Sequence, residues 1–255
     1  MKAIGIIPAR YASTRLEGKV LLDIAGKPMI QHVYERSSQS TLLAEVHVAT
    51  DDPRILSAVE RFGGKAHLTS PLHPSGTDRV AEVAAKLEAD IVVNIQGDEP
   101  LISPQMIDGT ILPFLEDSNL QMSTLCRRIT NPREVFDPNV VKVVQDRQGF
   151  ALYFSRSPIP FHREVWKGPG ASIEFRDGVV CYKHFGLYAY RKDFLLRFSD
   201  LEPTPLEKIE QLEQLRALEN GYGIKVVESE EETIGVDTQQ DLERVRATFG
   251  SGRGE

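Results

Sequence analysis

The chain has 255 residues, a hydrophobic content of 41% and a formal net charge of −7, which allows one large α/β domain or a domain with an inserted subdomain. The acidic balance argues against general nucleic-acid binding, so any anionic ligand must be met by local clusters of Arg and Lys. No apolar run approaches the roughly 18 residues of a membrane span, and no signal peptide is expected. The two cysteines, Cys126 and Cys181, form no CxxC motif. These features together favour a cytoplasmic protein with reduced thiols.

Short apolar segments alternate with amphipathic ones in the first half of the chain. This alternation is typical of βαβ units, in which helices cover a parallel sheet. The predicted buried strands are 2–7, 45–49 and 91–95. The predicted helices are 28–38, 52–62 and 77–87. In the second of these helices, Asp52 is expected to be the N-cap and Pro53 the first helical residue.

The sequence changes in character after about residue 120. Runs rich in Val, Tyr and Phe, separated by turn signals, predict antiparallel strands at 121–128, 140–145, 150–154 and 182–190. Residues 155–180 hold three prolines, three glycines and the only tryptophan, which predicts a long loop or arm with a functional or contact role. Helices are expected over 205–220 and from Thr238 to about Phe249, and residues 251–255 are expected to be a disordered tail.

The loop after the first predicted strand is unusually cationic for an acidic protein. It reads PARYASTRLEGK and contains Arg10, Arg15 and Lys19, but neither a Walker A motif nor a GxGxxG motif. In open α/β sheets ligands bind beyond the carboxyl ends of the strands, and guanidinium groups match phosphate oxygens well. A triphosphate site is one interpretation of this loop; a solvated loop is an equal alternative on these residues alone.

Aspartates follow two other predicted strands. Asp98 lies in QGDEP and Asp237 in IGVDT. Carboxylates at strand ends are favoured Mg²⁺ ligands, although Gly-Asp and Glu-Pro also form turns, and Asp237 could simply precede a capping arrangement of Thr238 with Asp241. Together with the cationic loop, the two aspartates indicate metal-assisted phosphoryl transfer.

Three further segments carry polar residues that have a structural and a functional interpretation. HPSGTDR (73–79) leads into a helix, and YKHFGLYAYR (182–191) places His184 and Tyr188 on one side of a strand. A lone strand histidine is more often structural. In 205–221 the glutamates 207, 210 and 213 lie beside an apolar stripe formed by Leu206, Ile209, Leu212, Leu215 and Leu218. Such glutamates ordinarily form the solvated face of an amphipathic helix.

Taken in order, these segments resemble one enzyme family. IPARYASTRLEGK, ATDD, SGTDR, NIQGDEP, YKHFGLYAYR, LEKIEQLEQLR and GVDTQQDLERV are similar to the 3-deoxy-manno-octulosonate (Kdo) cytidylyltransferases, the CMP-Kdo synthetases of bacterial lipopolysaccharide synthesis. The resemblance runs from about residue 2 to residue 249. Sialic-acid cytidylyltransferases share the IPAR opening, whereas the later segments in this order are specific to the Kdo branch. One position departs from the family loop RLPGK, because Glu17 replaces its proline.

The resemblance implies a fold and a reaction. The fold would be a Rossmann-like nucleotide-diphospho-sugar transferase domain over residues 1–250, with an inserted antiparallel region at about 121–190 that helps to form a homodimer. The anomeric hydroxyl of Kdo would attack the α-phosphorus of CTP and expel pyrophosphate. Mg²⁺ would be the cofactor, held by Asp98 and Asp237, and Lys19 would join these two aspartates as a catalytic residue.

The same resemblance assigns the binding residues. The expected nucleotide-binding residues are Ala9, Arg10, Ser13, Arg15, Lys19 and Ser75. The expected sugar-binding residues are Arg79, Gln96, His184, Tyr188, Glu210 and Glu213, with Arg79 as the partner of the sugar carboxylate. Two alternatives remain: a cytidylyltransferase for 8-amino-Kdo or another acidic sugar, and a non-catalytic nucleotide-binding protein on the same fold. The presence of all three catalytic residues argues against the second.

Overall fold

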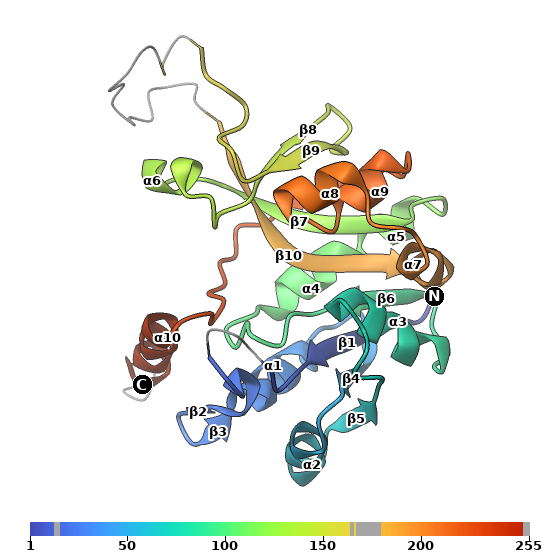
Figure 1. Cartoon of the computed structure of the whole chain (residues 1–255), viewed down its shortest axis with the longest axis vertical. Coiled ribbons are helices and arrows are strands. Elements are labelled where there is room, and N and C mark those ends of the chain that lie inside the picture. Colours follow the sequence, from blue (N-terminus) through green and yellow to red (C-terminus); the bar gives the residue numbers. More distant parts are fainter. Residues whose placement is uncertain (13–15, 164–165, 167–179, 252–255) are drawn as a thin grey trace.

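The computed structural model describes residues 1–12, 16–163, 166 and 180–251. Within these residues the organising element is a nine-stranded sheet, accompanied by a small two-stranded sheet (Figure 1). The strands of the large sheet are β1 (Ala3–Ala9), β4 (Leu43–Thr50), β5 (Lys65–Leu68), β6 (Ile91–Asn94), β7 (Met122–Arg128), β8 (Lys142–Gln145), β9 (Ala151–Ser155), β10 (Tyr182–Arg191) and β11 (Ile224–Glu228). The small sheet consists of β2 (Asp23–Ile24) and β3 (Lys27–Pro28).

The large sheet is mostly parallel along its main path, and β10 is the strand that breaks the pattern. The order along this path is β11-β7-β10-β6-β1-β4-β5, and the β8–β9 hairpin is joined to β10. Strand β10 runs antiparallel to β6 on one side and to β7 on the other. Tyr188 of β10 pairs with Asn94, the last residue of β6. The part of β10 before Tyr188 therefore extends beyond the carboxyl end of β6, where an α/β sheet binds its ligands.

Helices cover both faces of the sheet. The helices of the described residues are the 3-10 helix η1 (Lys19–Leu21) and the α-helices α1 (Met29–Ser37), α2 (Pro53–Arg61), α3 (Gly76–Ala85), α4 (Pro104–Ile111), α5 (Pro113–Glu116), α6 (Pro132–Phe136), α7 (Lys192–Ser199), α8 (Pro205–Glu210), α9 (Leu215–Glu219) and α10 (Gln239–Ser251). Side chains of α1, α2 and α4 pack with one set of strand residues, and those of α3, α7 and α9 pack with the other. Neighbouring residues of β1, Ile6 and Ile7, are fully buried in different clusters. Burial on both faces explains why this strand is apolar throughout.

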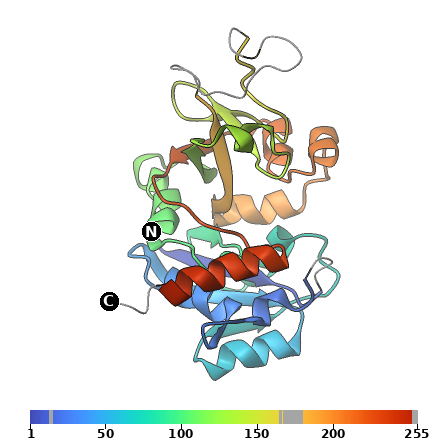
Figure 2. The same cartoon turned by 90° about the vertical axis from the view of Figure 1, so that its left-hand side faces the viewer.

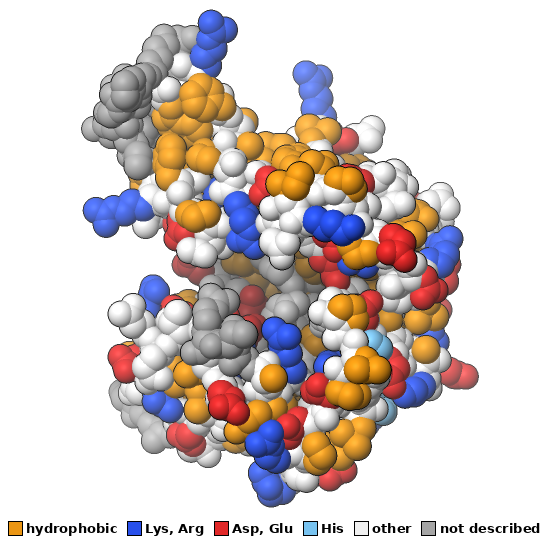
Figure 3. Space-filling view, viewed as in Figure 1, with side chains coloured by type: hydrophobic (Ala, Val, Ile, Leu, Met, Phe, Trp, Pro, Cys, Tyr) orange, Lys and Arg blue, Asp and Glu red, His pale blue; other side chains and the backbone are white. Residues whose placement is uncertain are grey.

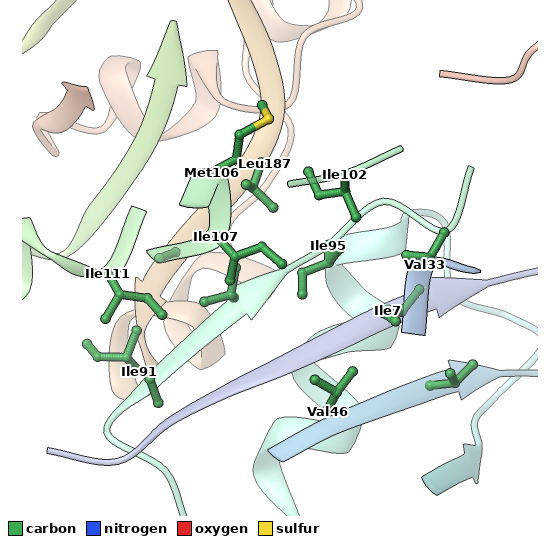
Figure 4. Packing of buried hydrophobic residues seen from close by; sticks show 14 of the residues in the cluster. Ile7, Val33, Val46, Ile91, Ile95, Ile102, Met106, Ile107, Ile111 and Leu187 are labelled. Carbon is green, nitrogen blue, oxygen red and sulfur yellow. The ribbon is translucent and has the colours of Figure 1, made fainter. Parts of the chain in front are cut away.

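The first of these clusters holds β1 and β6 next to each other. Figure 4 shows Ile7 of β1 and Ile91 of β6 in this cluster, with Val33 of α1 and Met106 of α4 packed in the same core. All four side chains are at most 1% exposed. Because the two strands are parallel, this packing also fixes the loops that follow them at one edge of the sheet.

The C-terminal segment returns to the half of the molecule that contains β1. The chain crosses from β11 to α10, which packs beside β2 and β3 (Figure 2). Leu242 and Val245 of α10 are buried together with Ile24 and Met29. The backbone N–H of Val236 donates a hydrogen bond of 2.8 Å to the carbonyl oxygen of Asp98. This crossing therefore places Asp237 beside the end of β6.

The predictions for the first half of the chain are confirmed. β1, β4 and β6 occupy the predicted strand segments, and α1, α2 and α3 occupy the predicted helices. The Asp52 side chain caps α2 by accepting a hydrogen bond from the Arg54 N–H. In the second half, β7, β8, β9 and β10 form at the four predicted segments and pair antiparallel with one another.

The prediction of one helix over 205–220 is wrong. Helix α8 ends at Glu210, Gln211 adopts a left-handed backbone with φ 54°, and α9 begins at Leu215. Each side of the break is held by a different part of the fold. Glu210 accepts hydrogen bonds from Ser155 and Arg156, whereas Glu213 accepts one from Thr77. The apolar stripe is divided as well, because Leu212 and Leu215 are buried while Ile209 is 78% exposed and Leu206 is 37% exposed.

Some expectations fall outside the described residues. Most of the predicted arm over 155–180 and residues 252–255 of the predicted tail lie there, while Ser251 is the last residue of α10. Trp166 is described, and it is buried with Ile129, Val135 and Cys181. Both thiols are free and buried. The single domain over residues 1–250 stays a prediction. No helix in the described part of the chain combines the length and hydropathy that crossing a membrane requires.

Gly97, which precedes Asp98, is predicted to tolerate no larger side chain. A Cβ there would lie 2.9 Å from the backbone carbonyl oxygen of Pro8 in β1. Gly97→Ala should therefore destabilise the protein by about 1–3 kcal/mol, the usual cost of overpacking. Urea unfolding measures the change in the free energy of unfolding.

Gly109→Ala is the matched control for this substitution. Gly109 lies within α4, and its added Cβ would meet Leu125 at an ordinary 3.6 Å. Replacing a helical glycine by alanine should leave stability unchanged or raise it. Equal losses of stability in the two variants would contradict the close-approach argument.

Candidate active site

A cavity of about 300 Å³ lies at the carboxyl ends of β1 and β6. We call it the first cavity. Its lining includes the residues predicted to bind nucleotide or metal that the structure describes, namely Ala9, Arg10, Lys19, Ser75, Asp98 and Asp237. Ser13 and Arg15 lie outside the described residues. The first cavity thus brings together segments from both ends of the sequence.

A turn before η1 fixes the position of Lys19. Gly18 has a left-handed backbone with φ 62°, and its N–H donates a 2.9 Å hydrogen bond to the carbonyl oxygen of Tyr11. A side chain on Gly18 would collide with the Tyr11 ring at 2.9 Å. Glycine is therefore needed at this turn, both for its backbone freedom and for the close approach of the ring.

Lys19 bridges the two predicted metal ligands. Its Nζ lies 2.5 Å from Oδ2 of Asp98 and 3.0 Å from Oδ1 of Asp237. Burial alone would lower the pKa of this ammonium, but the two carboxylates outweigh burial and raise its pKa above the ordinary value. Lys19 therefore stays charged at neutral pH, and a single cation fits between both aspartates.

The beginning of α3 forms another wall of the first cavity. Ser75 caps this ten-residue helix in a capping box with Asp78, and Ser75 and Gly76 both line the cavity. The amino end of a helix carries unpaired N–H groups and a partial positive charge, both of which favour anions. This wall and the nearby Arg10 and Lys19 make the first cavity suitable for phosphate groups.

Arg79 also lies at the first cavity, and its guanidinium is already paired. It contacts Thr69 and the backbone of Ser70, and its Nη2 lies 3.2 Å from Oδ2 of Asp51. The residue is 4% exposed. The structure therefore places Arg79 with the expected nucleotide-binding residues and away from His184 and Tyr188, which were expected to bind the sugar with it.

A second and larger cavity of about 820 Å³ lies on the β10 side. Its lining includes three predicted sugar-binding residues, Gln96, His184 and Tyr188. Gln96 and Asp237 line both cavities, so the two spaces meet at these residues. Figure 3 shows the molecule hollowed between its upper and lower parts, on the side where β10 begins in Figure 1.

A bulge in β10 connects the two halves of the site. The pairing of β10 with β7 shifts between Phe185 and Tyr188. The bulged carbonyl of Gly186 accepts a 3.0 Å hydrogen bond from Nε2 of Gln96. Gln96 is thereby held across the boundary between the cavities.

His184 is an uncharged hydrogen-bonding group. Burial lowers its pKa to about 3. Its Nε2 lies 3.0 Å from Oγ1 of Thr124, and that hydroxyl lies 2.8 Å from the carbonyl oxygen of Leu187. The hydroxyl of Thr124 has one hydrogen, and we assign it to the hydrogen bond with the Leu187 carbonyl oxygen. Nε2 of His184 is therefore the donor to Thr124, and Nδ1 is left as an acceptor.

The predicted sugar ligands Glu210 and Glu213 line neither cavity within the described residues. The Glu210 carboxylate is held 2.6 Å from Oγ of Ser155 and 3.0 Å from the N–H of Arg156. Glu213 is partly buried; desolvation raises the pKa of its carboxyl group, which accepts a hydrogen bond from the hydroxyl of Thr77 at the start of α3. Their binding of the sugar stays a prediction, and these contacts favour positioning roles for both carboxylates.

Sequence reasoning missed other polar residues of the second cavity. Arg156 and Lys183 line it. So does Gln214, which is 5% exposed and has an Nε2 without a hydrogen-bond partner among the described residues. No motif marked Arg156, and the expected straight helix gave no signal for Gln214. Only the break after Glu210 shows that Gln214 reaches the cavity.

The two aspartates fit a magnesium ion. The described residues contain no group of three or more His, Cys, Asp or Glu side chains that could hold a metal. Mg²⁺, however, is usually bound by one or two carboxylates together with water and substrate phosphates. Asp98 and Asp237, already bridged by one ammonium group, meet that requirement.

His184 is expected to remain neutral throughout the pH range of the folded protein. Its pKa of about 3 leaves the free base as the only populated form above pH 5. The measurement is the imidazole ¹³C shift by NMR between pH 5 and 8, with the signal assigned by its loss in His184→Gln. A titration midpoint near the ordinary histidine value of about 6.5 would contradict the desolvated environment and the hydrogen bond assigned to this imidazole.

The comparisons with known proteins agree with this geometry. Residues 4–233 match the family model described as cytidylyltransferase. The 3-deoxy-manno-octulosonate cytidylyltransferase of Geotalea uraniireducens is 60% identical over 245 residues, covering 96% of this chain and 98% of the relative. The enzyme of the same name from Geotalea daltonii is 58% identical, covering 96% and 97%.

A solved structure supports the same assignment. CMP:2-keto-3-deoxy-manno-octonic acid synthetase complexed with CTP superposes with a TM-score of 0.91 at 48% identity, covering 99% of this chain and all of the other. The family match extends over most of the chain, and the relatives match it over nearly their full length. The chain is therefore a member of the cytidylyltransferase family and, within it, of the 3-deoxy-manno-octulosonate cytidylyltransferases.

Proposed function

We propose that this enzyme transfers CMP from CTP to the anomeric hydroxyl of Kdo, giving CMP-Kdo and pyrophosphate. The observation that carries the proposal is the shared boundary of the two cavities at Gln96 and Asp237. A cation-lined space suited to a triphosphate meets a larger polar space there. The names of the relatives and the CTP complex of the similar structure support the same pair of substrates.

The first cavity provides the charge that the reaction requires. Arg10, Lys19 and the start of α3 would neutralise the triphosphate and the leaving pyrophosphate. In-line displacement at phosphorus depends mainly on positioning and charge rather than on covalent help from the protein. Nucleotide contacts by Ser13 and Arg15 belong to this proposal, on the resemblance alone.

Mg²⁺ is the proposed cofactor, and Asp98 and Asp237 are the residues that would hold it. When bound, the ion would supply Lewis-acid polarisation of the phosphate and favour the ionised form of the attacking hydroxyl. The backbone hydrogen bond from Val236 to Asp98 keeps the two aspartates adjacent.

The cytoplasm is the proposed location of the enzyme.

The second cavity is the proposed site of the sugar acid. His184 and Tyr188 would offer uncharged hydrogen-bonding groups, because burial holds the pKa of His184 at about 3 and raises that of Tyr188 well above its ordinary value. Gln96 would contact substrate at the boundary. The placement of Arg79 in the first cavity does not support its predicted pairing with the sugar carboxylate, whereas Arg156 and Lys183 are cations of the second cavity.

The proposed reaction can be tested by measuring pyrophosphate release with CTP and Kdo in the presence of Mg²⁺. Kdo should be used well above sialic acid and glucose 1-phosphate, and CTP well above ATP or GTP. Preference for 8-amino-Kdo would keep the mechanism and change the substrate. Release with glucose 1-phosphate and UTP but not with Kdo and CTP would refute the proposal, and CTP binding without any release would indicate a non-catalytic protein.

Asp98→Asn and Asp237→Asn should each lower kcat by at least about 10²-fold, the scale for losing one major electrostatic group. Asp193→Asn is the matched control, because its carboxylate is 76% exposed and lies in α7, so its turnover should be unchanged. Near-normal turnover of either active-site variant would remove that residue from the metal role.

A homodimer is the proposed assembly. Leu152 of β9 is 63% exposed and Ile209 of α8 is 78% exposed. The two elements are neighbours, because Glu210 of α8 is hydrogen-bonded to Ser155 of β9. Figure 3 shows hydrophobic side chains gathered on the upper part of the molecule, where β9 and α8 lie. Burial of such a surface would stabilise association.

Ile209→Asp is expected to weaken the dimer by at least about tenfold, because it places a charge in an apolar contact. Sedimentation velocity at micromolar concentrations measures the effect. Leu115→Asp is the control, since Leu115 is also exposed, at 59%, but lies in α5. A monomeric wild-type protein at these concentrations would refute the proposed assembly.

A further inference from the structure

Lys19 lies where a divalent ion shared by Asp98 and Asp237 would have to bind. Its ammonium contacts Oδ2 of Asp98 at 2.5 Å, Oδ1 of Asp237 at 3.0 Å and the carbonyl oxygen of Val236 at 3.2 Å. These contacts use all three of its hydrogens. A divalent ion could not share the same two oxygens with the ammonium, because two cations at such short separations repel each other strongly.

The aspartate pair is held together without the lysine. The Val236 N–H donates to the carbonyl oxygen of Asp98 at 2.8 Å, and Val236 is fully buried beside Ile24 and Met29. The residue after Asp237, Thr238, is fixed by hydrogen bonds of 2.9 and 2.7 Å to Asp241. The two carboxylates would therefore remain adjacent if the ammonium moved away.

Only the side chain of Lys19 would have to move. Its backbone is fixed by the glycine turn at Gly18, whose N–H is hydrogen-bonded to the carbonyl oxygen of Tyr11, whereas its four-carbon stem is flexible. The side chain is 15% exposed, and Lys19 lines the first cavity together with Arg10. The ammonium can therefore reach a phosphate group placed in that cavity.

A nucleoside triphosphate would allow the ammonium of Lys19 to be exchanged for a divalent ion between the two aspartates. It gives the ammonium a new anionic partner, and it gives the metal the oxygen ligands that two carboxylates alone do not provide. Mg²⁺ loses its water reluctantly, so it is a poor competitor for the aspartates while the ammonium stays between them. Nucleotide and metal would thus each favour the binding of the other.

We propose that Lys19 is a stand-in cation, which occupies the Asp98–Asp237 pair in the nucleotide-free enzyme, excludes the divalent ion from it and moves to the triphosphate when metal and nucleotide bind together. This inference rests on the proposed function, since it takes the triphosphate and the metal from it. It assigns to Lys19 control over when the metal binds, in addition to its contact with phosphate.

The test is Mn²⁺ binding to the nucleotide-free protein, followed by electron paramagnetic resonance of the free ion. Lys19→Met and Lys19→Gln should bind Mn²⁺ at least about tenfold more tightly than the wild type, within the usual range of coupling between sites. Lys19→Arg keeps a cation at this place and should stay close to the wild type. Adding Asp98→Asn to Lys19→Met should abolish the gain.

Lys65→Met is the matched control for loss of one positive charge. Lys65 is 56% exposed and pairs with Glu45, and it lines neither cavity. Its Mn²⁺ affinity should equal that of the wild type. Thermal melting by circular dichroism identifies the folded variants. If Lys19→Met does not fold, Lys19→Gln is the neutral variant that is compared with the wild type and combined with Asp98→Asn.

Mn²⁺ affinity within twofold of the wild type in both neutral Lys19 variants would overturn the inference, as would an equal gain in Lys65→Met. A gain that survives Asp98→Asn would also overturn it, because the ion would then bind elsewhere. Failure of the proposed function has a separate signature: the wild type would release no pyrophosphate from CTP and Kdo, whatever the Mn²⁺ titrations show.

Discussion

The site depends on the antiparallel placement of β10 between β6 and β7. Because β10 runs against its neighbours, Tyr188 pairs with the last residue of β6 and the preceding residues extend past that strand. His184 and Tyr188 are thus held over the loop that carries Gln96 and Asp98. A loop could place the same side chains there, but a strand paired on both sides holds them with far less conformational freedom.

The two cavities are connected by hydrogen bonds as well as by shared residues. Gln96 donates to the Gly186 carbonyl of β10, and Asn94 of β6 donates to Thr77 at the start of α3. Thr77 in turn donates to Glu213. These contacts join β6, β10, α3 and the α8–α9 break around one point. A displacement of any of these elements would change both cavities, which suits a reaction between two substrates that must be held in line.

The parts of this arrangement that could be predicted from the sequence are those with local causes. Apolar runs predicted β1, β4 and β6, and the capping residue Asp52 marked the start of α2. The break at Gln211 has no local signal, because it follows from distant partners of Glu210 and Glu213. The pairing of Arg79 with Asp51 likewise joins separate segments. The motif SGTDR therefore marked Arg79 as a site residue but could not predict which cavity it lines. The place of Gln214 in the second cavity likewise depends on the break between α8 and α9 and could not be predicted from the sequence.

Two cations of the first cavity are paired with carboxylates of the protein, and this pairing bears on how a polyanion binds. Lys19 is paired with Asp98 and Asp237, and Arg79 with Asp51. A cluster of unpaired cations would repel one another and destabilise the fold, particularly around buried groups. Internal pairing removes that repulsion, but a triphosphate that uses the charge of Lys19 or Arg79 must then displace a carboxylate. In the proposed exchange, a divalent ion that took over the displaced carboxylates would offset this cost, so the arrangement that stabilises the free protein would also couple nucleotide binding to metal binding.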